Sequence, residues 1–576
     1  MIDAKLYFNG DDCFLAWAMP FTPDCWGFAI HCDLKTADGK HFSWFIKNRT
    51  GFEGESNQPH SKKPSSEWPF QRYTWTDHGV SEGDTVSYAI SPVLKTTQGL
   101  KVDQTIVAKV GPVTLTAEGD GKASAYFNRG ILLSQFMAKR LGDDWSKSDL
   151  LKLKKDLRKD DSELRVFLSG PLGARLVKLL DQAKQEKWHV YAALYELEDD
   201  QLIQALKALG KKAHLLLANG SKKKKGEDGN AAAAKALGKA VDLNRRMLWS
   251  EGLAHNKFVV FAKTPSEPFV AWTGSTNWAT TGLCTQLNNG ILVQDPRLAA
   301  AYLKQWKLLK DDRRTGRGGA KMHFGDDLMA SNDSVKTGSA GSAGKWTTWF
   351  TRTSAGQEME AVTKLINGAE EAILFLMFEP GSTGLLQVIQ ARLSSAAGTE
   401  NRKLYIHGVV NTLKPGKKGQ DVNVELIGRG GHKPFDLRVV QPEGVPGGLG
   451  DWATEVMRRD FLIGQGGVIG HAIIHSKVIV IDPFTKPVVI TGSHNFSQAA
   501  SSKNDENLLI VEGNKGLAER YAVHIMGAYQ HYRWRAYLQD CEARGVEPWK
   551  GLKKSDKWQD RDAPHDAELR FWLRTL

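Results

Sequence analysis

Two copies of a short set of reactive side chains occur in the sequence. In each copy His-x-Lys is followed, 19 residues after the histidine in the first and 17 in the second, by Gly-Ser-x-Asn. Each set supplies an imidazole, an ammonium group, a hydroxyl and an amide, which together can attack a phosphodiester, hold its oxygens and protonate its leaving group. We therefore expect each copy to form half of an active site. The two sets are His255, Lys257, Ser275 and Asn277, and His475, Lys477, Ser493 and Asn495.

The similarity continues beyond these patterns. Each histidine and lysine stand two apart in a run that reads as a strand, so their side chains point to the same face. A second apolar run precedes each Gly-Ser-x-Asn, and the hairpin between the runs is two residues longer in the first copy. When the two copies are aligned with this two-residue difference, Asn288 of the first copy corresponds to Glu506 of the second. A lone His-x-Lys carries little information, but this extended match indicates an internal duplication.

These motifs resemble the phospholipase D superfamily, whose signature is His-x-Lys, four residues, Asp, and then Gly-Ser-x-Asn. The resemblance covers both halves, from about residue 126 to the C-terminus. Asp482 keeps the aspartate of the second motif, whereas Ala262 replaces that of the first. In the family this aspartate usually supports the strand and its turn, so the replacement affects local rigidity more than chemistry.

The resemblance implies a covalent phosphohistidine intermediate, later attacked by water or an alcohol, without a metal or another cofactor. The lysines and the asparagines of the two motifs would clamp the phosphate oxygens. The residues expected to be catalytic are His255, Lys257, Asn277, His475, Lys477, Asn495 and Glu506. Those expected to contact substrate are Ser275, Ser493 and Asn288.

The chemical difference between the two copies predicts a role for each histidine. A carboxylate bonded to an imidazole raises its pKa and favours imidazolium, whereas an amide orients the ring without stabilising that charge. With Glu506 facing it, His475 suits the general acid. With Asn288 facing it, His255 suits the neutral nucleophile. The tyrosyl-DNA phosphodiesterase branch of the superfamily looks similar, with an amide behind the first histidine and a carboxylate behind the second.

The elements that must position these groups follow from the wider pattern. Helical patterns alternate with buried-strand runs in both halves, which predicts an α/β sheet in each. The preceding segment has short alternating runs between turn signals, which predicts a β-sandwich, and it resembles a fibronectin type III domain. We expect an α/β fold class, with two pseudo-twofold-related phospholipase D-like α-β-α sandwich repeats after an all-β sandwich. The predicted domains are 1–125 (sandwich), 126–330 (first half), 331–345 (flexible Gly/Ser-rich linker) and 346–576 (second half).

Composition narrows the class of protein. A chain of 576 residues is longer than a typical single domain, so we expect more than one domain. Its net charge of +12 favours anionic partners such as nucleic acid or an acidic membrane surface. It has no run of about 18 apolar residues and no secretory signal pattern, so we expect a cytoplasmic protein. Five scattered cysteines indicate neither a disulfide framework nor a zinc site. Because both half-sites lie in one chain, a monomer should suffice for a complete site.

Three functions remain open at this point. A nuclease cleaving DNA or RNA, favoured by the basic charge and by the amide and carboxylate pair, predicts strong salt dependence and cleavage in chelator. A phospholipase D, hydrolysing or transphosphatidylating phospholipids, predicts an apolar rim and phosphatidyl transfer to added alcohol. A non-catalytic binding protein predicts ligand binding that survives removal of His255.

Overall fold

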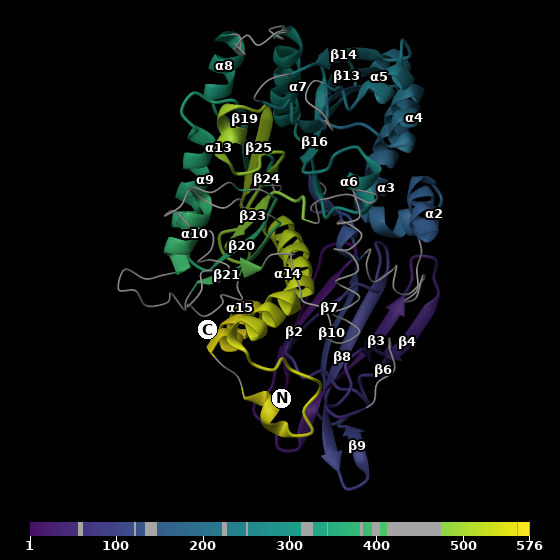
Figure 1. Cartoon of the computed structure of the whole chain (residues 1–576), viewed down its shortest axis with the longest axis vertical. Helices are drawn as coiled ribbons and strands as arrows, with labels where there is room; N and C mark the ends of the chain where they lie inside the picture. Colours follow the sequence, from purple (N-terminus) through teal and green to yellow (C-terminus); the bar gives the residue numbers. More distant parts are fainter. Residues whose placement is uncertain are drawn as a thin grey trace.

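We describe the protein from a computed structural model, shown in Figure 1. It describes residues 1–55, 61–119, 122–132, 147–221, 227–248, 252–312, 326–341, 344–378, 380, 384–393, 404–411, 439–440, 474–560 and 563–574.

The N-terminal segment forms the predicted β-sandwich. Its sheets meet through aromatic side chains, since Trp17 of one packs edge-on against Phe28 of the other, with 5.8 Å between ring centroids. The described cysteines are all buried and free, including Cys13, Cys25 and Cys32 of this domain. One sheet contains β1 (Asp3–Phe8), β2 (Cys13–Ala18) and β7 (Thr74–Asp77). The other contains β10 (Ala108–Thr114), β8 (Thr85–Thr96), β3 (Cys25–Lys35) and β4 (His41–Phe45), with β9 (Gly99–Val102) beside β8; β5 (Lys47–Asn48) pairs with β6 (Lys63–Pro64).

The first half is a seven-stranded mixed sheet in the order β11-β17-β16-β15-β12-β13-β14. Its strands are β11 (Ala123–Phe127), β12 (His189–Leu194), β13 (Ala213–Ala218), β14 (Asp242–Arg246), β15 (Lys257–Ala262), β16 (Pro268–Gly274) and β17 (Asn289–Val293). Its helices are α2 (Lys147–Arg158), α3 (Glu163–Gln185), α4 (Asp200–Ala208), α5 (Ala231–Leu237), α6 (Thr280–Cys284) and α7 (Pro296–Asp311). The side chains of β12 and β13 are buried on both faces, which explains their continuous apolar sequence.

The second half repeats this plan in an eight-stranded sheet, β18-β19-β25-β24-β23-β20-β21-β22. Its strands are β18 (Lys336–Ser339), β19 (Lys345–Thr351), β20 (Ala372–Met377), β21 (Tyr405–Val410), β22 (Val439–Val440), β23 (Val478–Ile481), β24 (Val488–Gly492) and β25 (Glu506–Glu512). Its helices are α8 (Asp326–Asp333), α9 (Gln357–Asn367), α10 (Leu385–Leu393), α13 (Gln498–Ser502), α14 (Lys515–Arg544) and α15 (Ala563–Leu573). In both sheets a parallel pair, β12-β13 or β20-β21, continues through two antiparallel strands that carry the His-x-Lys and Gly-Ser-x-Asn patterns. The predicted α/β duplication is confirmed.

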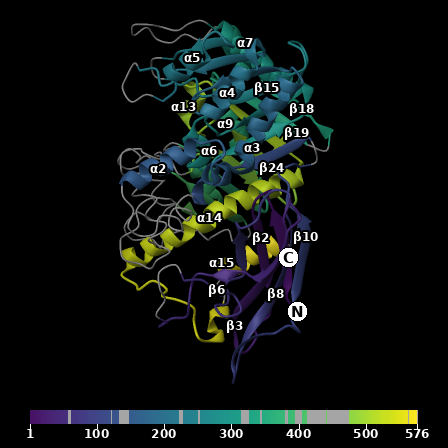
Figure 2. The same ribbon diagram turned by 90° about the vertical axis from the view of Figure 1, so that its right-hand side faces the viewer.

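The long helices α7 and α14 join the parts of the molecule. Helix α7 follows β17 and contacts β18 and β19 of the other half, while α14 follows β25 and contacts β11 of the first half and β1 of the sandwich. Figure 2 shows α14 running between the two α/β halves and the sandwich. The C-terminal helix α15 also packs on β1 and β2, and the Tyr7 hydroxyl donates to the Trp572 carbonyl. No helix among the described residues is both long and apolar enough to cross a membrane.

The predicted segment boundaries differ from the observed elements in two places. Strand β11 (Ala123–Phe127) joins the sheet of the first half, so the boundary at 125 falls inside a strand. The stretch 331–345, predicted to be a flexible linker, contains the end of α8 and strand β18, which pairs antiparallel with β19. Its small residues are compatible with an edge strand because that pairing uses only backbone groups.

Candidate active site

The two halves meet at the segments that carry the histidines. The His255 amide donates to the carbonyl of Asp505, over 2.9 Å, just before β25. The His475 amide donates to the carbonyl of Leu287, over 3.0 Å, just before β17. Each histidine is therefore fixed by backbone of the opposite half, as expected for a pseudo-twofold interface.

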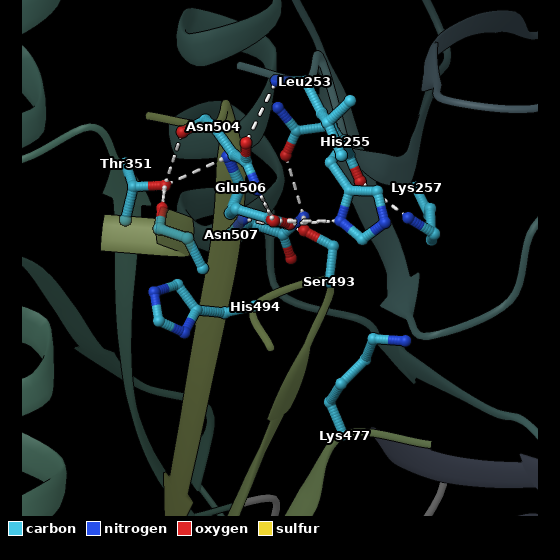
Figure 3. Close-up of polar contacts among 12 residues, drawn as sticks. Leu253, His255, Lys257, Thr351, Lys477, Ser493, His494, Asn504, Glu506 and Asn507 are labelled. Atoms are coloured by element: carbon cyan, nitrogen blue, oxygen red, sulfur yellow. Dashed lines mark hydrogen bonds and ion pairs between the residues drawn. The ribbon is translucent and has the colours of Figure 1, made fainter. Parts of the chain in front are cut away.

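The same crossing decides what lies behind each imidazole. His255 Nδ1 lies 2.8 and 2.9 Å from the two carboxylate oxygens of Glu506 (Figure 3), and His475 Nδ1 lies 3.0 Å from Oδ1 of Asn288. The predicted pairing of His475 with Glu506 and of His255 with Asn288 is wrong. The reason is geometric: Asn288 and Glu506 begin or precede the strands at the interface, so their side chains reach across the axis.

Hydrogen bonding fixes which ring nitrogen carries the proton. The Asn288 amide nitrogen donates to the Gly282 carbonyl over 2.8 Å, so its oxygen must face His475 and accept. The Glu506 carboxylate can only accept, and its pKa is lowered because His255 and Lys257 outweigh the effect of burial. In both neutral rings Nδ1 therefore donates, and Nε2 is the nitrogen with a free lone pair for chemistry.

Each lysine is buried beside its own histidine. Lys257 Nζ donates to the His255 carbonyl over 2.8 Å, and Lys477 Nζ donates to the His475 carbonyl over 2.6 Å. Only 1% of Lys257 and 0% of Lys477 is exposed. Burial lowers the pKa of Lys257 to about 7, although Glu506 and Glu196 act in the opposite direction. Figure 3 shows Lys257 beside His255 and Lys477 below it, on separate segments of the chain.

The two histidines and the two lysines lie close enough to influence one another's charge, as the pKa values of the histidines show. Burial lowers the pKa of His255 to about 4, with Glu506 opposing the shift and both lysines adding to it. Burial lowers the pKa of His475 well below its usual value, and Lys477, Lys257 and His255 add to that shift. The sequence prediction that the two cassettes form a single site thus agrees with the charges that each group experiences.

The glycines of the two Gly-Ser-x-Asn patterns permit a close backbone approach. Gly274 and Gly492 have φ angles of 149° and 147°, and a Cβ on either would lie 2.3 Å from the carbonyl oxygen of Asn289 or Asn507. A side chain there would separate the strand that ends in the motif from its neighbour.

The residues predicted to contact substrate lie behind the histidines. Ser275, Ser493 and Asn288 are each 0% exposed. The Ser275 hydroxyl donates to Asn288 Oδ1 over 2.8 Å and accepts from the Asn289 amide, and the Ser493 hydroxyl accepts from the Asn507 amide. Their hydrogen bonds are made within the protein, which favours a positioning role over direct contact with substrate.

The two motif asparagines each have a buried amide oxygen, Oδ1, without a hydrogen-bond partner in the described structure. The amide nitrogen of Asn277 donates to a carboxylate oxygen of Glu196 over 2.6 Å. The other oxygen of Glu196 accepts from the Ser221 hydroxyl. Asn277 therefore uses one of its two amide N–H groups on Glu196, and its role as a phosphate clamp stays a prediction.

Sequence reasoning missed an aromatic side chain in each half. Tyr195 follows β12 and packs edge-on against His255, at 4.7 Å between centroids, with the Lys257 ammonium 5.0 Å from its ring. Phe378 follows β20 and lies 4.8 Å from the His475 ring and 4.8 Å from the Lys477 ammonium. A signal existed: both aromatics come directly after corresponding strands and directly before a glutamate.

Asn128 is a second omission. Its amide nitrogen donates to three carbonyls, those of Gly282, Leu283 and Gln286, and its oxygen accepts from the Asn288 amide over 2.8 Å. It thereby builds the turn from which Asn288 reaches His475. Nothing in its sequence context marks it.

The motif aspartate has the supporting role that the resemblance implied. Asp482 accepts hydrogen bonds from the backbone amides of Glu370, Glu371 and Ala372, at 2.9, 2.7 and 2.8 Å. Ala262, at the corresponding position, instead continues β15 and pairs with His189, so β15 is two residues longer than β23. The first half thus replaces a side-chain anchor with additional strand pairing.

Comparison with known proteins supports the duplicated arrangement. The family model described as cardiolipin synthase, PLD-like domain, matches residues 176–309 and 409–527, one segment in each half. A phospholipase D of Rickettsia felis is 45% identical over 67 residues, which are 12% of this chain and 30% of that protein. The chain thus spans about a third of the length of that relative.

The solved structures that resemble this chain have lower sequence identity to it. Phosphatidylserine synthase of Haemophilus influenzae is 13% identical with a TM-score of 0.39, covering 63% of this chain and 85% of the other. Yeast tyrosyl-DNA phosphodiesterase is 10% identical with a TM-score of 0.33, covering 58% and 85%. The family match in both halves, together with the two crossed His-Lys cassettes, identifies two phospholipase D-like halves in this chain.

Proposed function

We propose that this protein is a phosphodiesterase that acts through a phosphohistidine intermediate without a metal, and that its substrate is DNA or RNA. The observation that carries the proposal is the pair of histidines whose Nδ1 atoms donate across the interface, to Glu506 and to Asn288, which leaves Nε2 of each ring for the reaction. A nucleophile and an acid of the same residue type, backed by different groups, are what a two-step displacement needs.

The first step uses His255 as nucleophile. Its Nε2 attacks phosphorus, an N–P bond forms, and the bond from phosphorus to the leaving oxygen breaks. The imidazole becomes cationic in this step, and the Glu506 carboxylate at Nδ1 stabilises that charge. A carboxylate serves the nucleophile better than the acid, because on an acid it would stabilise the proton that must leave.

His475 is then the acid and base. Protonated at Nε2, it gives its proton to the leaving oxygen; in the second step it takes a proton from water, whose oxygen attacks phosphorus as the N–P bond breaks. The anionic phosphate raises the pKa of the bound imidazole toward protonation, which opposes the lowering caused by burial and by the two lysines. The products are an alcohol and a phosphomonoester. This assignment keeps the roles predicted from sequence, although the reasoning now rests on the opposite pairing.

The choice of nucleic acid rests on charge. A net charge of +12 favours a polyanion, and electrostatic attraction supplies much of the affinity of nucleic-acid enzymes. We place the protein in the cytoplasm as a monomer, as the sequence analysis expects. We further propose that the N-terminal sandwich is fibronectin type III-like, which its three-stranded and five-stranded antiparallel sheets support.

A phospholipase D is the second candidate. One observation favours it: the short stretch of high identity is shared with a protein named phospholipase D, and the matching family model is described by a lipid-synthesising enzyme. On this alternative the phosphohistidine would carry a phosphatidyl group.

Activity assays in the presence of a metal chelator distinguish these candidates. Wild type and His255→Ala are assayed in parallel on labelled single-stranded DNA, double-stranded DNA, RNA and phosphatidylcholine vesicles, with His41→Ala as the control because His41 is exposed in the sandwich. We expect nucleic-acid cleavage that is lost only in His255→Ala and that falls steeply with salt. Choline release alone would select the phospholipase. Inactivity on every substrate, with binding unchanged in His255→Ala, would select a binding protein.

A further inference from the structure

The half-site of His255 contains a carboxylate that the reaction does not require. Glu196 lies two residues after β12 and is half-buried. One of its oxygens accepts from the Asn277 amide nitrogen over 2.6 Å, and the other accepts from the Ser221 hydroxyl. It is also close enough to Lys257 to oppose the lowering of that pKa. Glu196 thus touches one group of the site and acts electrostatically on another.

The contact with Asn277 has a chemical consequence. An amide can donate to a phosphate oxygen only through its nitrogen, and here one of the two N–H groups of that nitrogen is bound to Glu196. The amide oxygen is left buried without a partner in the described structure, and only 5% of Asn277 is exposed. The Glu196 carboxylate is therefore held against the Asn277 motif and within electrostatic range of the Lys257 ammonium.

The charges of the four ionisable side chains set the preferred charge of the phosphate. With both lysines protonated, Glu506 and Glu196 leave the set close to neutral, whereas without Glu196 it would carry one net positive charge. A phosphodiester has one negative charge and a phosphomonoester about two at neutral pH. The electrostatic energy of a bound anion is proportional to its charge, so a carboxylate beside the phosphate penalises the doubly charged species twice as strongly.

We infer that Glu196 is a specificity-determining residue, which makes the site select singly charged phosphodiesters and reject or release doubly charged phosphates. The inference rests on the proposed phosphodiesterase function and deepens it, since the product of hydrolysis is a phosphomonoester that this carboxylate would help to expel. The second half repeats the preceding aromatic and the glutamate in its sequence as Phe378-Glu379, and Glu379 lies outside the described residues.

The test compares two anions whose charges do not change with pH. Sulfate, a dianion, and dimethyl phosphate, a monoanion, are titrated calorimetrically at pH 6, where Lys257 is protonated, into wild type, Glu196→Gln, Glu196→Asp and Glu198→Gln. Glu196→Gln keeps the shape and removes the charge, and Glu196→Asp keeps the charge. Glu198 is the matched control because it lies two residues away, pairs with Arg158 and has 62% of its side chain exposed.

We expect Glu196→Gln to bind dimethyl phosphate about threefold and sulfate about tenfold more tightly than wild type, since the gain for a dianion is the square of the gain for a monoanion. Glu196→Asp and Glu198→Gln should behave as wild type. An equal gain for both anions, or sulfate binding equally weak in all four proteins, would overturn the inference. These titrations need no turnover, so a failure of the proposed activity on every phosphodiester would be seen separately.

Discussion

The imidazole of His255 becomes cationic in the proposed first step, and its environment is suited to that change. The ring is 4% exposed, donates Nδ1–H to Glu506 and packs against Tyr195. Its pKa of about 4 keeps Nε2 unprotonated, and so nucleophilic, over the whole physiological range.

The histidine that carries phosphate can be identified directly. In His475→Asn the base of the second step is missing, so a phosphoenzyme should accumulate when bis(p-nitrophenyl) phosphate is the substrate, because p-nitrophenolate leaves without an acid. Tandem mass spectrometry should locate the phosphate on His255. The converse variant, His255→Asn, retains His475. A phosphate found on His475 in that variant would refute the assignment.

The pKa of Lys257 predicts the pH dependence of the reaction. With bis(p-nitrophenyl) phosphate, kcat/KM should rise as pH increases through about 4, where His255 loses its proton, and fall as pH increases through about 7, where Lys257 loses its charge. In Lys257→Arg the guanidinium stays charged, so the fall near pH 7 should disappear even if the rate is lower. A fall that persists unchanged in Lys257→Arg would assign it to another group.

At the scale of the elements, the two halves fix the strand that carries His-x-Lys in different ways. Three backbone amides donate to Asp482 in the second half, whereas the first half has a longer β15 with Ala262 buried in it. Asp482→Ala should lower the free energy of unfolding by roughly 3 kcal/mol, because three buried donors lose a charged acceptor.

Restoring the aspartate in the first half should not help. Ala262→Asp would place a carboxylate at a fully buried strand position that pairs with His189, so we expect it to destabilise the protein by a similar or larger amount. Chemical denaturation of both variants measures this. An increase in stability of Ala262→Asp would show that the first half had retained an unused set of amide donors.

The success of sequence reasoning also differs between elements. The strands of the cassettes were predictable because a period of two and runs of β-branched residues are local signals. Strand β18 was not, because its Lys-Thr-Gly-Ser sequence lacks an apolar alternation and becomes a strand through backbone pairing with β19. The partners of the histidines were not predictable either: alignment of the repeats shows that Asn288 corresponds to Glu506, but which half each side chain serves depends on how the halves pack.

At the scale of the whole molecule, two adjacent residues join the sandwich to the active site. Asn128 holds the turn of Asn288, and Arg129 bonds to the Asp11 carboxylate over 2.9 Å and to the Val80 carbonyl over 2.7 Å, both in the sandwich. Asp11 and Arg129 are buried, so the pair is isolated from solvent and its loss is costly.

This connection predicts that a change in the sandwich reaches the chemistry. Asp11→Asn leaves Arg129 without a charged partner, and we expect kcat to fall by about tenfold with little change in KM, since His475 loses orientation and the lysines are untouched. Asp38→Asn, an exposed change in the same domain, is the control. Equal kcat in Asp11→Asn and wild type, with the protein folded by circular dichroism, would show that the sandwich and the site are uncoupled.

The hydrogen bonds that cross between the two halves also determine when, during synthesis of the chain, the active site can first become complete. His255 obtains its carboxylate from a residue 251 positions later in the chain, and the backbone that fixes it, at Asp505, is made at the same late stage. During synthesis on the ribosome the first half can fold its sheet and carry its histidine and lysine, yet it has neither the acid nor the group that stabilises the nucleophile. If the proposed nuclease function holds, an enzyme built in this way stays inert beside the nucleic acids of the translation machinery until residue 506 has emerged.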